Sequence, residues 1–232
     1  MNIHCCSFAS ESFTQRQNIQ NKFFLKVGFK EENIHLCNPE TLDFKFFQSF
    51  PNASEKNRFG WFSFKPYFML SILKKLNEGD ILFYLDVNDE PHNGIRDYIE
   101  GFFLKNRNVD FLGLLTNYPN LKFSSKFHKY NLSIELLIAS LFNCQPEAGA
   151  IAIRNSPKAR SMLSIWYNLT LINGHHLINL KDTNSRHDQE TLFILSRIYK
   201  SIKLESWFFY KITGKGLRKY IKFEGLRNHS LY

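Results

Sequence analysis

Oxygen-bearing side chains follow a short apolar run in the first half of the chain. The run Ile81–Leu85 is followed by Asp86, Asn88, Asp89 and Glu90. Carboxylate and amide oxygens suit Mg²⁺ or Mn²⁺, which prefer hard oxygen ligands and keep open positions for substrate phosphates. An extended chain would place Asp86 and Asn88 on one side and Asp89 on the other. We therefore expect a divalent cation here; the alternative is an ordinary turn after a strand.

Two other segments carry residues that suit a phosphorylated ligand. The sequence RFGWFSFKP, residues 58–66, places four aromatic side chains around a glycine and contains Lys65. Aromatic faces stack on a nucleobase or a sugar, and a lysine can neutralise phosphate. The alternative is a hydrophobic lead-in to a helix with a solvent-exposed lysine. Further along, Glu147 stands two residues before Gly149, and a glycine at that point allows close approach of the backbone to a ligand. The alternative there is a plain strand entry.

A third segment, RHDQET, stands where a helix is expected to begin. It contains His187 and Asp188. Histidine is a common metal ligand or acid and base, and the amino end of a helix attracts phosphate. The alternative is that Asp188 caps the helix and His187 is exposed.

These residues need elements that bring them together. Buried apolar runs predict strands over residues 3–8, 32–39, 81–85, 109–115, 149–154 and 202–206. Apolar spacing predicts helices. Their ends are indicated by Ser10 and Asp188 as caps, Gly28 and Gly79 as stops and Pro66 at a first helical position. They cover residues 11–27, 66–79, 94–106, 132–142, 156–174 and 189–200.

Because strands alternate with helices, we expect an α/β protein with a largely parallel central sheet flanked by helices. Ligands of such sheets gather beyond the carboxyl ends of the strands. Asp86 stands at such an end if residues 81–85 form a central strand.

Composition narrows the classes of protein and of partner. Of the 232 residues, 44% are hydrophobic and 24 are phenylalanine, which is ample for a core and excludes a disordered chain. The net charge of +9 favours anionic partners such as nucleic acid, anionic lipid or phosphorylated small molecules. We predict a domain over residues 1–205 and a basic tail over residues 206–232. The tail is either a solvated terminal helix or a contact with anionic membrane lipid.

Cysteine usage and the start of the chain bear on the compartment. The four cysteines form no C-x-x-C pair, which argues against a zinc ribbon and predicts buried free thiols in a reducing cytosol. No signal peptide and no apolar run of about 18 residues is visible. We therefore expect a cytoplasmic protein.

The order of several motifs resembles that of the bacterial GT-A-type glycosyltransferases of capsule and lipopolysaccharide synthesis. The motifs are SFAS at residues 7–10, GWFSFKP at 60–66, GDILFYLD at 79–86, EAGAIAIRN at 147–155 with Trp166 downstream, and HDQ at 187–189. The resemblance covers residues 3–195. The chain departs from the family with Phe64 in place of a tryptophan and Asp86-Val87-Asn88-Asp89 in place of D-x-D. The second metal ligand is therefore open between Asn88 and Asp89.

The resemblance implies a single GT-A-like, Rossmann-related domain that moves a sugar from a nucleotide-diphosphate donor to a hydroxyl of a glycan or lipid-linked acceptor. It implies that a divalent cation assists, held by Asp86, Asn88 and His187. The implied donor site comprises Ser7, Phe8, Ala9, Lys65, Tyr84 and Asp86. Asp188 or Glu147 would contact the acceptor hydroxyl and serve as general base if the reaction inverts.

Two other functions stay open at this point. A metal-dependent nucleotidyl- or phosphotransferase would share the metal chemistry, but the sequence has no G-x-x-x-x-G-K-[ST] phosphate loop. A basic nucleic-acid-binding module would bind DNA or RNA with strong salt dependence. The transferase hypothesis predicts no nucleic-acid partner and saturable binding of a nucleoside diphosphate.

Overall fold

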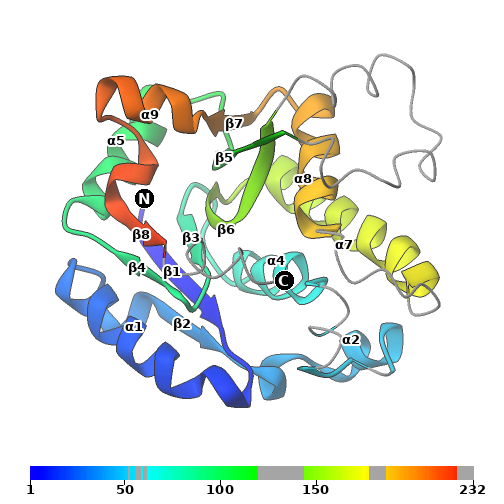
Figure 1. Cartoon of the computed structure of the whole chain (residues 1–232). Helices are drawn as coiled ribbons and strands as arrows, with labels where there is room; N and C mark the ends of the chain where they lie inside the picture. The colour runs from blue at the N-terminus through cyan, green and yellow to red at the C-terminus, as the bar shows by residue number, and fades with distance from the viewer. Residues whose placement is uncertain (52, 56–58, 60–61, 120–143, 178–186, 224–232) are drawn as a thin grey trace.

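The computed structural model describes residues 1–51, 53–55, 59, 62–119, 144–177 and 187–223 (Figure 1). The helix predicted over residues 132–142 lies outside the described residues, as do Gly60, Trp61 and most of the polar segment that precedes His187.

A six-stranded sheet forms the centre of the molecule, in the order β2-β1-β3-β6-β5-β7. The strands are β1 (Ile3–Phe8), β2 (Ile34–Cys37), β3 (Ile81–Leu85), β5 (Phe111–Pro119), β6 (Cys144–Arg154) and β7 (Ile202–Glu205). The pairs β1–β2, β1–β3 and β5–β7 are parallel, whereas β6 is antiparallel to both β3 and β5. Among the strands that the structure describes in this sheet, only β6 therefore runs against the others, and the predicted mostly parallel α/β fold is confirmed.

Helices cover both faces of this sheet (Figure 1). Helices α1 (Thr14–Lys26) and α5 (Ile95–Lys105) pack on one face, and α4 (Phe64–Leu73), α7 (Pro157–Leu177) and α8 (His187–Ile198) pack on the other. Since both faces are covered, every residue of β1 and β3 is buried, which explains their unbroken apolar character.

Smaller elements connect these layers. They are η1 (Glu11–Phe13), η2 (Glu31–Asn33), η3 (Pro39–Thr41), α2 (Phe44–Ser49), β4 (Asp89–Pro91), α9 (Trp207–Thr213), η7 (Leu217–Tyr220) and β8 (Ile221–Phe223). Strands β4 and β8 pair antiparallel as a separate two-stranded sheet.

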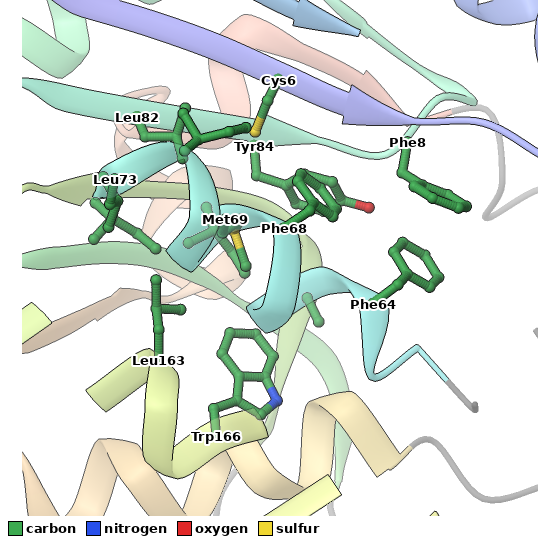
Figure 2. Packing of buried hydrophobic residues seen from close by; sticks show 14 of the residues in the cluster. Cys6, Phe8, Phe64, Phe68, Met69, Leu73, Leu82, Tyr84, Leu163 and Trp166 are labelled. Atoms are coloured by element: carbon green, nitrogen blue, oxygen red, sulfur yellow. The ribbon is translucent and has the colours of Figure 1, made fainter. Parts of the chain in front are cut away.

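The larger hydrophobic cluster lies between the sheet, α4 and α7. Figure 2 shows Phe64, Phe68, Met69 and Leu73 of α4 between Tyr84 and Leu82 of the sheet and Leu163 and Trp166 of α7. The rings of Phe8 and Phe64 stack with centroids 4.0 Å apart. This packing fixes the amino end of α4 against β1 and β3, and it thereby positions Lys65.

Several predicted element boundaries are wrong. Helix α4 begins at Phe64, and Pro66 lies within its first turn, where a missing N–H breaks no intrahelical hydrogen bond. Strand β6 begins at Cys144, five residues before the predicted start. Helix α8 begins at His187, so Asp188 lies inside the helix. The side chain of Ser10 makes no capping hydrogen bond, and the helix after it opens as the 3₁₀ turn η1.

The described part of the basic segment is folded onto the rest of the chain. It forms α9, η7 and β8, and the side chains of Leu217 and Ile221 are buried with residues of β1, β3 and α5. The division into residues 1–205 and 206–232 stays a prediction.

Two other predictions concern cysteines and membrane helices. The thiols of Cys5, Cys6 and Cys37 are free and buried. Among the residues that the structure describes, no helix combines the length and the apolar character needed to cross a membrane.

Candidate active site

Four elements meet at one edge of the sheet. Strand β3 ends there at Leu85, and because β6 is antiparallel to β3, the first half of β6 lies at the same edge. The register pairs Leu85 with Ala150, which brings Glu147 close to the end of β3. The first turns of α4 and α8 reach this edge as well, since Lys65 and Asp188 contact each other there.

Asp86 opens a tight turn immediately after β3. Its backbone N–H donates to the carbonyl of Gly149 at 2.7 Å, and the N–H of Asp89 donates back to the Asp86 carbonyl at 2.9 Å. The amide Nε2 of Gln20 donates to the carbonyls of Asp86 and Asp89, each at 2.8 Å. The expected extended arrangement of Asp86 and Asn88 is therefore wrong, because residues 86–89 form a turn.

Lys65 lies at the centre of the site, and its side chain is 3% exposed. Its Nζ lies 3.0 Å from Asp188 Oδ2, 3.2 Å from Asp86 Oδ1 and 3.2 Å from the carbonyl of Ala148. Burial lowers the pKa of Lys65, but the carboxylates of Asp188 and Asp86 outweigh it and raise that pKa above its usual value. The alternative of a solvent-exposed lysine is wrong, and the ammonium group instead joins two carboxylates.

Tyr84 orients the Asp86 carboxylate through a hydrogen bond. It lies on β3, is 1% exposed, and donates its hydroxyl to Asp86 Oδ1. Burial and the neighbouring Asp86 charge raise the pKa of Tyr84 well above its usual value, so the phenol keeps its proton. The Asp86 side chain itself is 38% exposed.

Asp188 is the buried carboxylate of the site. It is 4% exposed, contacts Lys65 through Oδ2, and accepts the N–H of Gln189 on Oδ1 at 3.0 Å. It is not the cap expected from the sequence, since it lies within α8. Its carboxylate forms an ion pair with Lys65.

Glu147 is half-buried and lies beside Asp86. A Cβ atom added to Gly149 would stand 2.9 Å from Asp86 Oδ2 and 3.3 Å from Glu147 Oε1, so both carboxylates approach the same glycine. Gln189 Nε2 lies 3.5 Å from Glu147 Oε1. Two carboxylates thus stand close to Gly149, and the predicted approach of its backbone to a ligand stays a prediction. Gln189 had no predicted role, although the quoted HDQ motif contains it.

Ser7, Phe8 and Ala9, three residues of the implied donor site, are buried. Ser7 is 0%, Phe8 6% and Ala9 2% exposed. Gln17 Nε2 donates to the carbonyl and the hydroxyl of Ser7, and the Ala9 N–H donates to the Cys37 carbonyl. Their role at a nucleotide stays a prediction.

The aromatic side chains near Lys65 belong largely to the core. Phe59 and Phe64 are buried and pack edge to face, with Phe64 also stacked on Phe8. Phe62 is half-buried, and the Lys65 ammonium lies 4.8 Å from its ring centre. Trp61 lies outside the described residues. Phe59 and Phe64 thus pack within the core, and stacking of the aromatic residues of segment 58–66 on a base or sugar stays a prediction.

The structure describes the side chains of some predicted metal ligands and not of others. Asn88 is half-exposed in the turn after Asp86, whereas Asp89 is 6% exposed at the start of β4. His187 is the first residue of α8, and its side chain lies outside the description. Within the described residues, no group of three or more His, Cys, Asp or Glu side chains is placed to hold a metal ion.

Arg218 is a further charged residue near this edge that the sequence did not assign to the site. It lies on η7 and is half-buried; burial lowers the pKa of Arg218, and the charges of Glu147, Tyr210 and Asp89 oppose that shift. The signal in the sequence was its position in a basic segment, which does not reveal that η7 packs against β5.

Comparisons with known proteins bear on the fold. No protein-family model matches the chain, and a search of curated proteins found no match. Solved structures do match: a glycosyltransferase involved in glycosylation of the major capsid of PBCV-1 has a TM-score of 0.51 and 9% identity. That alignment covers 97% of this chain and 95% of the other.

Two further structures give the same TM-score of 0.51. Mouse xyloside xylosyltransferase 1 is 10% identical, with 98% of this chain and 99% of that chain covered. The galactosyltransferase LgtC, in complex with donor and acceptor sugar analogues, is 11% identical, with 88% and 73% covered. At these identities the likeness concerns the fold alone, and it confirms the expected GT-A-like architecture.

Proposed function

We propose that this protein is a glycosyltransferase that moves a sugar from a nucleotide-diphosphate sugar to a hydroxyl of an acceptor. The observation that carries the proposal is the meeting of Asp86, Lys65, Asp188 and Glu147 at one sheet edge. The fold is shared with known glycosyltransferases, and ligands of such sheets bind at this edge. Fold and site therefore support the same reaction.

The donor would bind on the side of Asp86. Tyr84 holds one oxygen of this carboxylate and Lys65 contacts both, so its orientation is set before a ligand arrives. The side chain is 38% exposed, which leaves it accessible to a metal or ribose. Lys65 itself is surrounded by protein acceptors, so its part at the donor is to hold Asp86 and Asp188 in place.

The side chains proposed as metal ligands suit Mn²⁺ or Mg²⁺. Asp86 and Asn88 carry oxygen atoms of the preferred kind, and His187, whose side chain lies outside the described residues, is the third proposed ligand. Asp86 and Asp188 bring two carboxylates to the one ammonium group of Lys65, which leaves this group of three side chains with a net negative charge. A divalent cation would balance the remainder and would stabilise the charge that grows on a diphosphate leaving group.

The acceptor would bind on the side of Glu147. Asp188 is buried and bound to Lys65, whereas Glu147 is half-buried and contacts the Gln189 amide. Of the two predicted carboxylates, Glu147 is thus the more accessible one. If the reaction inverts the anomeric centre, Glu147 would take the proton of the attacking hydroxyl; a retaining reaction needs no such base.

We further propose that the acceptor is a glycan or lipid-linked glycan in cell-surface polysaccharide synthesis. The order of the sequence motifs supports this assignment. The protein would act in the cytoplasm, with the basic segment 206–232 contacting anionic lipid at the inner face of the membrane. The net charge of +9 supports that contact.

A screen of nucleotide-diphosphate sugars tests the proposal. Purified protein is incubated with uridine- and guanosine-diphosphate sugars, with and without Mn²⁺, and release of the nucleoside diphosphate is measured. We expect release from at least one donor, and at least a hundredfold loss in Asp86→Ala. The unfolding midpoint of this variant should change little, because Asp86 is partly exposed and Lys65 keeps Asp188. Full turnover by Asp86→Ala would remove Asp86 from the site.

A further inference from the structure

The buried face of α1 is largely polar. Of the 13 residues of this helix, those that are buried are Gln17, Gln20 and Phe24. Gln17 and Gln20 are three positions apart, so their side chains lie on the same face of the helix. A buried amide destabilises a protein unless its polar atoms are hydrogen-bonded. The hydrogen bonds of these two glutamines therefore show what this face of α1 does.

Gln17 attaches α1 to the ends of two strands. Its Nε2 donates to the Cys37 carbonyl at 2.9 Å and to the Ser7 carbonyl at 3.2 Å. Cys37 is the last residue of β2, and Ser7 is the last but one of β1. Because β1, β2 and β3 are parallel, their carboxyl ends meet at one edge of the sheet. Gln17 thus holds α1 at the edge where Asp86 follows β3.

Gln20 reaches the Asp86 turn from this position. It is 2% exposed, and its Nε2 donates to the carbonyls of Asp86 and Asp89, each at 2.8 Å. Helix α1 also packs against β4, the strand that begins at Asp89 (Figure 1). Asp86 and Asp89 are the first and last residues of the turn, so a single amide group holds both of its ends.

The two donated hydrogen bonds account for a glutamine at this position. Exchanging the amide oxygen and nitrogen of Gln20 would place an oxygen against both carbonyls, so the orientation of the amide is determined by its partners. Within the described part of the chain, the buried Oε1 of Gln20 has no hydrogen-bond partner. A methionine would fill a similar space without burying an unpaired oxygen. What a glutamine adds here is therefore its hold on the turn.

The Asp86 turn is held from both faces of the sheet. Helix α4 lies on one face, and from there Lys65 Nζ contacts Asp86 Oδ1 at 3.2 Å. Helix α1 lies on the other face, and from there Gln20 holds the backbone of the turn. Lys65 and Tyr84 thus set the direction of the Asp86 carboxylate, whereas Gln20 sets the position of the backbone that carries it.

We propose that Gln20 is a positioning residue that fixes the Asp86 turn and thereby places the Asp86 carboxylate for a metal-bound nucleoside diphosphate. This proposal rests on the proposed function and deepens it. Gln20 acts through the backbone of the turn and not through a contact with the ligand. Because Asn88 lies in the same turn, loss of the Gln20 hydrogen bonds would displace both proposed oxygen ligands together.

Amide hydrogen exchange tests the hold on the turn without any ligand. Asn155→Leu is the matched control, because Asn155 is 1% exposed and its Nδ2 donates to three backbone carbonyls before the start of β3, at the far end of that strand. The Asp89 N–H, which donates to the Asp86 carbonyl, should exchange at least about tenfold faster in Gln20→Met than in Asn155→Leu. Equal exchange rates would overturn the proposal. Gln20→Asn keeps an amide on a shorter side chain; it replaces Gln20→Met if that variant does not fold and should show the same acceleration.

Calorimetric titration with uridine and guanosine diphosphate in the presence of Mn²⁺ tests the consequence for the ligand. Gln20→Met should weaken the binding of the diphosphate that the wild type takes about ten- to a hundredfold. Asn155→Leu should lower the unfolding midpoint and keep that affinity within twofold. An unchanged affinity in Gln20→Met, or an equal loss in Asn155→Leu, would overturn the proposal. If the wild type binds neither diphosphate, the proposed function fails, whereas the exchange rates still decide whether Gln20 holds the turn; the two failures are therefore distinct.

Discussion

Replacing Lys65 by methionine should destabilise the protein strongly, because two carboxylates lose their shared cation. Lys65 and Asp188 are 3% and 5% exposed at their side chains and lie 3.0 Å apart. Removing one partner of such a buried pair costs about 3–5 kcal/mol. For a chain of this length, 1 kcal/mol corresponds to roughly 2 °C in unfolding midpoint, so Lys65→Met should unfold about 6–10 °C earlier.

A second substitution, added to Lys65→Met, shows which carboxylate causes the loss of stability. Asp188→Asn in the Lys65→Met background should recover at least half of the loss, because it removes a buried unpaired charge. Asp86→Asn should recover less, because the Asp86 side chain is 38% exposed and water already compensates its charge. Thermal and denaturant unfolding at neutral pH measure all variants. A loss under about 1 kcal/mol for Lys65→Met, or a larger recovery with Asp86→Asn, would refute this reasoning.

Two further predictions concern Gly149 and His35. Gly149→Ala should lower transfer about ten- to a hundredfold, because its Cβ would stand 2.9 Å from Asp86 Oδ2. The control Gly101→Ala, whose Cβ would meet nothing within 4 Å, should leave transfer unchanged and stabilise α5 by about 0.5–1 kcal/mol. Equal transfer activity of the Gly149→Ala and Gly101→Ala variants would disprove that a Cβ at Gly149 displaces Asp86. Burial, then the charges of His4 and Lys75, lower the pKa of His35 to about 4. The unfolded chain therefore binds more protons between pH 6.5 and 4, and stability should fall by about 1 kcal/mol over that window, given partial exposure. Unfolding curves are measured at several pH values for His35→Gln and for His92→Gln, a control at an exposed histidine. The loss of stability due to His35 should appear in His92→Gln and be absent from His35→Gln. Identical dependence of stability on pH in the two variants would contradict this prediction.

The sequence predicted most of the sheet for a clear physical reason. Residues 3–8 and 81–85 are continuously apolar because both faces of their strands are covered, and this pattern is visible without a structure. It also predicted that Asp86 ends a central strand, which follows from the position of that run. The helix starts were less accurate, since Pro66 is tolerated throughout the first turn and does not fix its beginning.

The arrangement within the site could not be predicted in the same way. That Glu147 lies beside Asp86 depends on the antiparallel direction of β6, which local composition does not encode. A lysine taken alone suggests solvent exposure, and the burial of Lys65 follows only when Asp86 and Asp188 converge on it. Gln189 reaches Glu147 across a long chain separation, and this contact leaves no local pattern.

Calorimetric titration of nucleoside diphosphates is the most direct test of a donor site at Asp86. We predict that uridine or guanosine diphosphate binds the wild-type protein saturably, that Mn²⁺ strengthens the binding, and that Asp86→Ala removes it. Binding of duplex DNA with strong salt dependence, together with no binding of either diphosphate, would contradict the account and favour a nucleic-acid-binding protein.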